Sequence, residues 1–229
     1  KPVFCDVDRN TFNMSAENVE KLINKKTKAI IPVHLYGQSC DMEPILKLAL
    51  KHKLKVIEDN AQAIGCEYTF SNGDKKYTGT MGDIGTTSFY PTKNLGAYGD
   101  GGAVFTNDDK LAKKLIMIAN HGESKKYHHK IIGCNSRLDS IQAEVLNIKL
   151  KYLSDYNKAR NQIAENYNKA FSSVEQLHIP VLNNNSTHVY HQYTLRVHPI
   201  YRDPLRWYLK AKGIDNRIYY PIPLHKQKV

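Results

Sequence analysis

Apolar and polar positions along the first 120 residues predict short strands separated by helices. Apolar runs at residues 3–7, 29–33, 55–57, 84–89 and 102–105 predict strands, the third of which runs into Glu58 and Asp59. Between them, helical apolar spacing predicts helices that begin near Ser15, Asp41 and Asp108, residue types suited to a helix N-terminus. This alternation predicts an α/β fold, with a mostly parallel sheet flanked by helices.

The pattern changes near residue 137. Helices are predicted at residues 138–153 and 156–171, followed by a strand at 190–197, a helix at 203–212 and a strand from Ile214. We therefore expect three parts: a large α/β domain at residues 1–136, linker helices at 137–172 and part of a small C-terminal α+β domain at 173–229. The sequence starts within a predicted strand and stops just after a Pro-rich stretch, so we expect truncation at both ends.

The composition is that of a soluble globular protein. Hydrophobic residues make up 41% and charged residues 24% of the chain, and no apolar run approaches the roughly 18 residues of a membrane span. The four cysteines form no Cys-x-x-Cys pair, which favours structural thiols in a reducing compartment such as the cytoplasm. The histidines lack the spacing of a zinc site. We therefore expect no membrane segment and no metal.

The net charge of +11 favours an anionic partner, whether nucleic acid, acidic lipid or a phosphorylated small molecule. The basic residues are scattered in pairs, such as Lys25-Lys26 and Lys113-Lys114, and no nucleic-acid-binding motif accompanies them. Nucleic-acid binding thus rests on charge alone, and we expect none that is specific.

Asp59 is the first candidate for chemistry. It follows a buried strand directly, and parallel sheets bind ligands beyond the carboxyl ends of their strands. A carboxylate held there can pair with a cation. An Asp that caps the following turn explains the same pattern about equally well.

Lys93 is the second candidate. It lies just beyond the strand at 84–89, among small residues and near the glycines of residues 96–102. Burial or nearby charge there could lower its pKa and make its amine a nucleophile. The alternative is a surface lysine in a glycine turn. No Lys-Ser or Lys-Thr follows the glycines, which excludes an ordinary P-loop nucleotide-binding site.

Asn135 and Ser136 precede the predicted helix at residues 138–153. They could cap this helix, and its free amides could hold an anion. Capping alone is a sufficient explanation of these residues.

Together these motifs resemble the DegT/DnrJ/EryC1/StrS family, the PLP-dependent aminotransferases that act on nucleotide-linked keto-sugars. The matching segments occur in family order along almost the whole chain: residues 33–38, 58–65, 88–102, 121–122, 135–143 and 220–225. The resemblance implies the PLP-dependent transferase fold type I with pyridoxal 5′-phosphate as cofactor. It also implies a homodimer with active sites shared between the subunits.

The resemblance assigns roles to individual residues. Lys93 matches the catalytic lysine, which binds the cofactor covalently and later moves the proton of the substrate carbon. Asp59 matches the carboxylate that faces the pyridine nitrogen, and Gln62 an amide near the 3′-oxygen of the ring. Ser88 matches a hydroxyl bound to the cofactor phosphate. Asn135 matches a residue that reaches the phosphate in the neighbouring subunit.

The C-terminal matching segment implies substrate contacts. Tyr220 and His225 match substrate-binding positions, although Tyr219 stands where family members often have His. Lys93 itself discriminates within the family, because related sugar dehydratases carry His at that position. A lysine there favours transamination.

The resemblance implies transfer of an amino group from L-glutamate to a nucleotide-diphospho keto-deoxyhexose. The segments around Asp59 and Ser88 look most like members that make 3-amino-3,6-dideoxyhexoses for surface polysaccharide or lipopolysaccharide. The missing ends leave two alternatives open: a catalytically incompetent fragment, or a binding protein built on the PLP scaffold.

Overall fold

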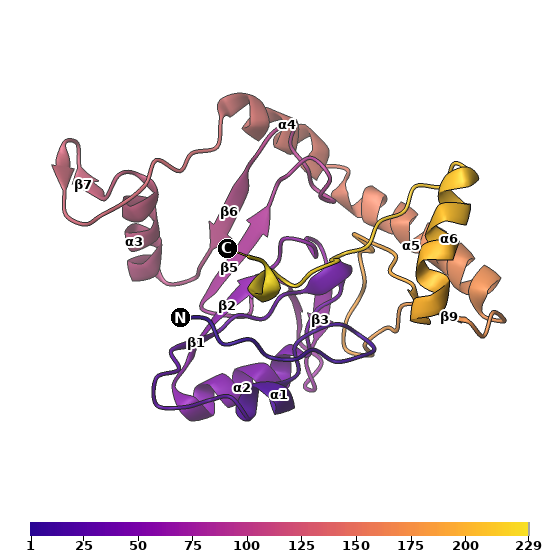
Figure 1. Cartoon of the computed structure of the whole chain (residues 1–229). Helices are drawn as coiled ribbons and strands as arrows, with labels where there is room; N and C mark the ends of the chain where they lie inside the picture. Colours follow the sequence, from indigo (N-terminus) through magenta and orange to yellow (C-terminus); the bar gives the residue numbers. More distant parts are fainter. Residues whose placement is uncertain (229) are drawn as a thin grey trace.

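The centre of the molecule is a four-stranded sheet (Figure 1), and the computed structural model describes residues 1–228. Its strands are β1 (Ala29–Ile30), β2 (Lys55–Asp59), β5 (Ile84–Ser88) and β6 (Gly102–Phe105), in the order β1-β2-β5-β6. The first three are parallel, and β6 runs antiparallel to β5. The expected mostly parallel sheet with flanking helices is confirmed.

Two helices cover one side of this sheet: α1 (Ala16–Glu20) and α2 (Met42–His52). The main core lies between them and the sheet, and its buried members include Val19, Met42, Ile45, Leu48, Val56 and Tyr68. Ser15 caps α1 as expected, since its Oγ accepts a hydrogen bond from the Asn18 N–H at 3.3 Å. Asp41 precedes α2 as expected, but its carboxylate accepts from the Tyr68 hydroxyl instead of the helix amides.

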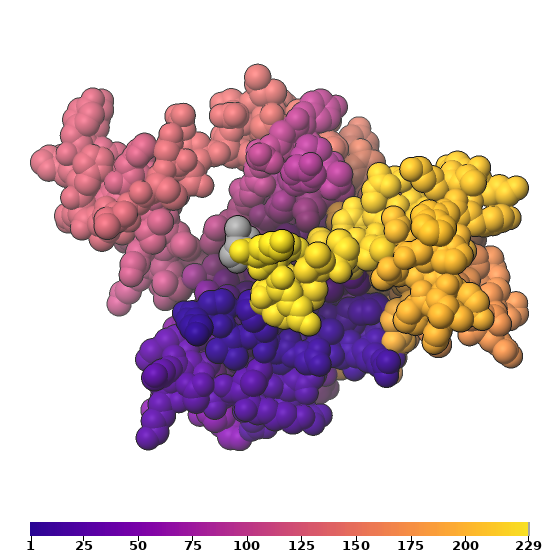
Figure 2. Space-filling view, in the orientation of Figure 1, coloured from indigo at the N-terminus to yellow at the C-terminus, as the bar shows by residue number. Residues whose placement is uncertain are grey.

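An arm, defined here as residues 120–139, follows α3 (Asp109–Ala119) and stands away from the body of the molecule (Figure 2). It contains the hairpin of β7 (Glu123–Lys125) and β8 (His128–His129), which the sequence pattern did not predict. A second unpredicted hairpin pairs β3 (Glu67–Thr69) with β4 (Lys75–Tyr77). As expected, Asp108 caps α3, because its Oδ1 accepts from two amides of the first turn.

The predicted linker helices are α4 (Ser140–Leu150) and α5 (Leu153–Phe171). Beyond them lie β9 (Leu177–His178), β10 (Arg196–Val197), α6 (Pro199–Ala211) and the short 3₁₀ helix η2 (Leu224–Lys226). The segment around η2 returns across the N-terminal segment (Figure 2), where the His225 ring lies 4.6 Å from that of Phe4. Within residues 1–228, no helix is long and apolar enough to cross a membrane.

Some predicted elements are wrong or shorter than expected. Residues 3–7 are no strand: only Val7 forms a bridge, to Met14, and Val3 is 66% exposed. With no neighbouring strand to complete its hydrogen bonds, an apolar run does not form a ladder. The strand at 190–197 shrinks to β10, and the described residues after Ile214 contain none. Val229, the last residue of the predicted small domain, lies outside the described residues.

Two predicted helix starts also differ. Asn135 and Ser136 do not cap α4, which begins at Ser140, because the backbone of Asn135 bridges to Asn120 in the arm. The helix expected at 203–212 begins earlier, at Pro199. A proline fits the first helical turn, where its missing N–H costs no hydrogen bond.

Candidate active site

The carboxyl ends of β2 and β5 meet at one edge of the sheet. Asp59 lies opposite Thr86, so Ser88 ends β5 two residues further along the same edge. The Asp59 backbone is held on both sides: its N–H donates to Pro32 O at 2.9 Å, and its carbonyl accepts from the His34 N–H at 3.0 Å. Its Oδ1 also accepts from the Ala61 N–H at 3.0 Å. Asp59 therefore caps the following turn and stands at the expected ligand-binding edge.

Lys93 lies in a turn after β5, which we call the Lys93 turn (residues 90–97). Its backbone N–H donates to Tyr90 O at 2.8 Å, and Leu95 and Ala97 of this turn are buried against Leu146 of α4. Lys93 is half-buried, which favours the buried amine over the surface lysine. Burial lowers the pKa of its amine, and the charge of nearby Asp59 opposes that effect.

Gln62 connects this edge with the C-terminal segment. Its Oε1 accepts from the Tyr36 N–H at 2.7 Å, and its Nε2 donates to the Tyr220 hydroxyl at 3.3 Å. Tyr36 lies in the 3₁₀ helix η1 (Leu35–Gly37), and its own hydroxyl donates to Tyr219 O at 2.6 Å. Two far-separated motifs of the sequence therefore meet at Gln62.

The remaining predicted site residues are more dispersed. The Ser88 hydroxyl accepts from the Tyr90 N–H at 3.2 Å, which leaves its own proton available for another acceptor. Asn135 is exposed in the arm, and His225 packs on Phe4. The structure thus gathers Asp59, Gln62, Ser88, Lys93 and Tyr220 around one sheet edge, whereas Asn135 and His225 share no hydrogen bond with them among the described residues.

Sequence reasoning missed Glu58, the residue before Asp59. Its side chain is fully buried, and its carboxylate accepts from the N–H groups of Gly79 (2.8 Å), Met81 (2.6 Å) and Gly82 (2.6 Å). A fourth donor is His34, whose Nε2 lies 2.9 Å from Glu58 Oε2. The available signal was the two-residue period of β2, which places Glu58 on the same buried face as Val56.

The hydrogen bonds fix the protonation of this pair. The Cys40 N–H donates to His34 Nδ1 at 3.1 Å, so the ring proton that reaches Glu58 is on Nε2. With four donors facing its oxygens, the Glu58 carboxylate is ionised. Burial alone would raise its pKa, but the hydrogen bonds from His34, Gly82 and Gly79 outweigh that effect and lower it. Because the His34 backbone also holds Asp59, the pair fixes the end of β2.

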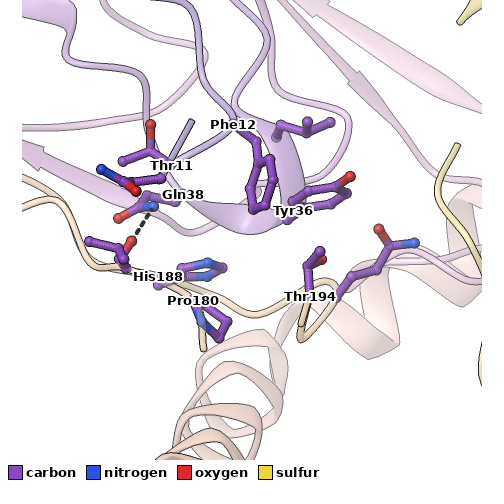
Figure 3. A pocket seen from close by; sticks show the side chains of 11 residues that line it. Thr11, Phe12, Tyr36, Gln38, Pro180, His188 and Thr194 are labelled. Carbon is purple, nitrogen blue, oxygen red and sulfur yellow. Dashed lines mark hydrogen bonds between the residues drawn. The ribbon is translucent and has the colours of Figure 1, made fainter. Parts of the chain in front are cut away.

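A separate small pocket lies where residues 10–12, η1 and the segment 180–194 meet (Figure 3). The rings of Phe12 and Tyr36, 5.4 Å apart and edge to face, lie on one side, with Pro180, His188 and Thr194 across from them. None of the predicted site residues lines this pocket. Tyr36 connects it with the sheet edge, because the Tyr36 backbone N–H donates to Gln62 Oε1.

Comparison with known proteins places this geometry in a family. The sequence profile of the DegT/DnrJ/EryC1/StrS aminotransferase family matches residues 1–229. The chain belongs to this family. It is 48% identical over all its length to a pleiotropic regulatory protein of Geobacillus stearothermophilus. Over 99% of the chain it is also 48% identical to the dTDP-3-amino-3,6-dideoxy-alpha-D-galactopyranose transaminase of Aneurinibacillus thermoaerophilus.

Among solved structures, S. venezuelae DesV in complex with a ketimine intermediate matches the whole chain with a TM-score of 0.93 and 39% identity. This likeness and the family match confirm the expected fold, the PLP-dependent transferase fold type I, and the family's cofactor, pyridoxal 5′-phosphate. The chain spans 60% of the length of each of these relatives.

Proposed function

We propose that this protein is an aminotransferase that moves an amino group from L-glutamate to a nucleotide-diphospho keto-deoxyhexose. The observation that carries the proposal is the half-buried Lys93 amine. It lies close enough to Asp59 at the sheet edge for the charge of that carboxylate to affect its pKa. A lysine with a lowered pKa beside a fixed carboxylate is the pair that PLP chemistry requires. Family membership supports the same conclusion.

The residues at the sheet edge fit pyridoxal 5′-phosphate by their chemistry. Lys93 would hold it covalently, Asp59 would pair with the protonated ring nitrogen, and Gln62 would contact the ring's 3′-oxygen. The Ser88 hydroxyl, whose oxygen accepts from the Tyr90 N–H, would donate its proton to the phosphate. When bound, the cofactor supplies an electron-accepting ring that stabilises negative charge on the substrate carbon.

The Lys93 amine has a second task in this proposal. Because burial lowers its pKa, more of the neutral amine is present near neutral pH than for an exposed lysine. A neutral amine can accept a proton from the substrate carbon and return it at another atom. The negative charge of Asp59 opposes this lowering of the Lys93 pKa, so part of the amine stays protonated.

The substrate class rests on a relative and on the C-terminal segment. The Aneurinibacillus thermoaerophilus relative is named as a transaminase of a dTDP-linked 3-amino-3,6-dideoxy sugar, which supports a related keto-sugar here. We further propose that this sugar is used for surface polysaccharide or lipopolysaccharide. Tyr220, whose hydroxyl accepts from Gln62 Nε2, would contact this sugar, and His225, which packs on Phe4, would be a second contact. The excess of basic residues suits a diphosphate.

We further propose a cytoplasmic homodimer with shared active sites. The arm exposes apolar side chains, including Ile132, which is 99% exposed, and Tyr127, which is 79% exposed. Large exposed apolar residues gathered in one segment are typical of an interface. A partner seated on the arm would bring Asn135 toward the neighbouring subunit's cofactor phosphate. We retain the domain boundaries 1–136, 137–172 and 173–229 as part of this proposal, with α4 and α5 as the linker.

Labelling of Lys93 tests the proposal. We would incubate the protein with PLP, reduce with borohydride and map the modified peptide by mass spectrometry. We expect a pyridoxyl label on Lys93, which Lys93→Ala removes together with glutamate-dependent turnover. The matched control is Lys113→Ala, which deletes an exposed lysine of α3. Full turnover by Lys93→Ala would refute the aminotransferase.

The same assay separates the two alternatives. A label without any turnover across a panel of nucleotide-linked keto-sugars would favour the binding protein on a PLP scaffold. Neither label nor turnover would favour the incompetent fragment. The transaminase name of the Aneurinibacillus thermoaerophilus relative favours the enzyme over both.

A further inference from the structure

Asn94, directly after Lys93, is only 6% exposed and lies in a polar cluster that the proposed reaction does not use. Its Nδ2 lies 2.8 Å from Asn157 Oδ1 and 2.9 Å from Val189 O. A backbone carbonyl can only accept a hydrogen bond, so the contact with Val189 fixes which side of the Asn94 amide is nitrogen. The amide oxygen must therefore point to its other neighbour.

That neighbour is His191, whose Nδ1 lies 3.2 Å from Asn94 Oδ1. An amide oxygen only accepts, so Nδ1 must carry a proton. Burial, followed by the positive charges of Lys93 and Arg160, lowers the pKa of His191 to about 4. A neutral imidazole has a single N–H, and this one is therefore held with the proton on Nδ1 and a lone pair on Nε2.

The cluster is anchored on α5 from several sides. Asn157 Nδ2 donates to Ile64 O at 3.2 Å, and Arg160 Nη1 donates to Tyr190 O at 3.0 Å and more weakly to His191 O at 3.5 Å. The linker helix thus holds both the segment around His191 and the turn that follows Gln62. The Lys93 turn is the third element joined to them, through Asn94.

We propose that Asn94 and His191 are a positioning pair for Lys93, in which His191, protonated on Nδ1, ties the Lys93 turn to α5 and keeps its amine beside Asp59. The inference rests on the proposed function only for the reaction that Lys93 performs. The pairing itself belongs to the protein without cofactor, so its test needs neither PLP nor a sugar.

The first measurement reads the imidazole directly. In protein labelled with ¹⁵N-histidine and free of cofactor, two-bond ¹⁵N–¹H spectra distinguish the two neutral tautomers. The signal lost in His191→Asn identifies His191. We expect the Nδ1–H form, with no titration between pH 5 and 8. The Nε2–H form, or a midpoint near that of free histidine, would overturn the proposal.

The second measurement reads Lys93 through two matched variants. His191→Asn keeps an amide donor near the position of Nδ1, whereas His191→Gln moves that donor one methylene further out. Competitive acetylation with acetic anhydride across pH, followed by peptide mass spectrometry, gives the titration of each lysine, with exposed Lys113 as the internal reference.

We expect His191→Gln to loosen the turn, hydrate Lys93 and slow its acetylation at pH 8 by about threefold to tenfold, tenfold being one pKa unit. His191→Asn should stay within about twofold of the wild type, as a retained donor requires. An unchanged Lys93 rate in folded His191→Gln would overturn the positioning role. If His191→Gln does not fold, the tautomer in the wild-type protein still decides. A missing pyridoxyl label on Lys93 would refute the proposed function and leave both readouts standing.

Discussion

The end of β2 buries a charged group, whereas the arm exposes apolar ones. At the end of β2, a fully buried carboxylate on Glu58 meets four hydrogen-bond donors from its own chain. In the arm, residues 124–139 are all exposed, and the apolar side chain of Ile132 contacts almost nothing. Each region nevertheless carries a residue of the proposed site, Asp59 at the end of β2 and Asn135 in the arm.

The chain satisfies the hydrogen bonds at the end of β2 by itself, whereas the arm leaves apolar surface for another surface to cover. A buried ionised group persists only when its hydrogen bonds are satisfied, so the end of β2 is fixed within one chain. An extended arm with exposed apolar residues gains stability by covering them with another surface. We therefore expect substitution of the buried Glu58 to act on folding, and substitutions in the arm to act on function alone.

The largest expected effect is on stability at Glu58. In Glu58→Gln, the NH₂ group of the new side chain faces backbone N–H groups that need an acceptor, and the ion is lost. We expect the free energy of unfolding to fall by about 3 kcal/mol, the scale for breaking a buried hydrogen-bonded charge. Chemical denaturation measures it. Glu17→Gln, on the exposed ion pair with Lys21, is the control and should leave the midpoint unchanged.

The same residue gives a pH dependence with a definite sign. The folded-state pKa of Glu58 is lowered, so its contribution to stability is fully present above the unfolded value of about 4.3 and is lost as pH falls through the folded value. Between neutral pH and pH 3, the free energy of unfolding should therefore fall more steeply for the wild type than for Glu58→Gln. Parallel curves would contradict an ionised Glu58.

A smaller effect on stability is expected at Gly65, beside the polar cluster of Asn94, Asn157 and His191. Gly65 has φ +83°, and a Cβ there would lie 2.7 Å from Asn157 Nδ2. Gly73 has a similar φ of +89° with open space around it. Both Ala variants incur the backbone strain, of about 1 kcal/mol, but only Gly65→Ala also displaces Asn157. Thermal unfolding should show a lower midpoint for Gly65→Ala than for Gly73→Ala. Equal midpoints would show that Asn157 can move aside at no cost in stability.

The smallest stability effect is expected at Asn135. Asn135→Ala in the exposed arm should change the free energy of unfolding by less than about 0.5 kcal/mol, as is usual on a surface. The turnover of this variant should nevertheless fall, because in the proposed homodimer Asn135 completes the partner's site. A normal turnover for Asn135→Ala would remove Asn135 from the site.

Mixing subunits sharpens this last test. Refolded together in equal amounts, the inactive Lys93→Ala and the impaired Asn135→Ala should regain about a quarter of wild-type turnover, because half of the dimers are mixed and each has one intact site. No recovery in a mixture shown to exchange subunits would mean that both residues serve the same subunit.

The sequence by itself indicated the mostly parallel sheet, the sheet edge that carries Asp59, and the position of Lys93 just after a strand, but it left open whether that lysine is buried. Strand–helix alternation and the position of a residue just after a strand are local properties, and local patterns report them directly. The prediction of a short strand was wrong where no neighbouring strand was available, as at residues 3–7, because a ladder requires a second strand.

Only the tertiary structure decided how those residues are held. Glu58 is paired with His34, 24 residues earlier, and Asn94 meets Asn157 and His191, 63 and 97 residues later. Nothing in the local pattern specifies such pairs, since each side chain becomes buried and fixed only when distant segments supply its hydrogen-bond partners. Sequence therefore predicted which groups react, and folding determined their neighbours, their protonation and their positions.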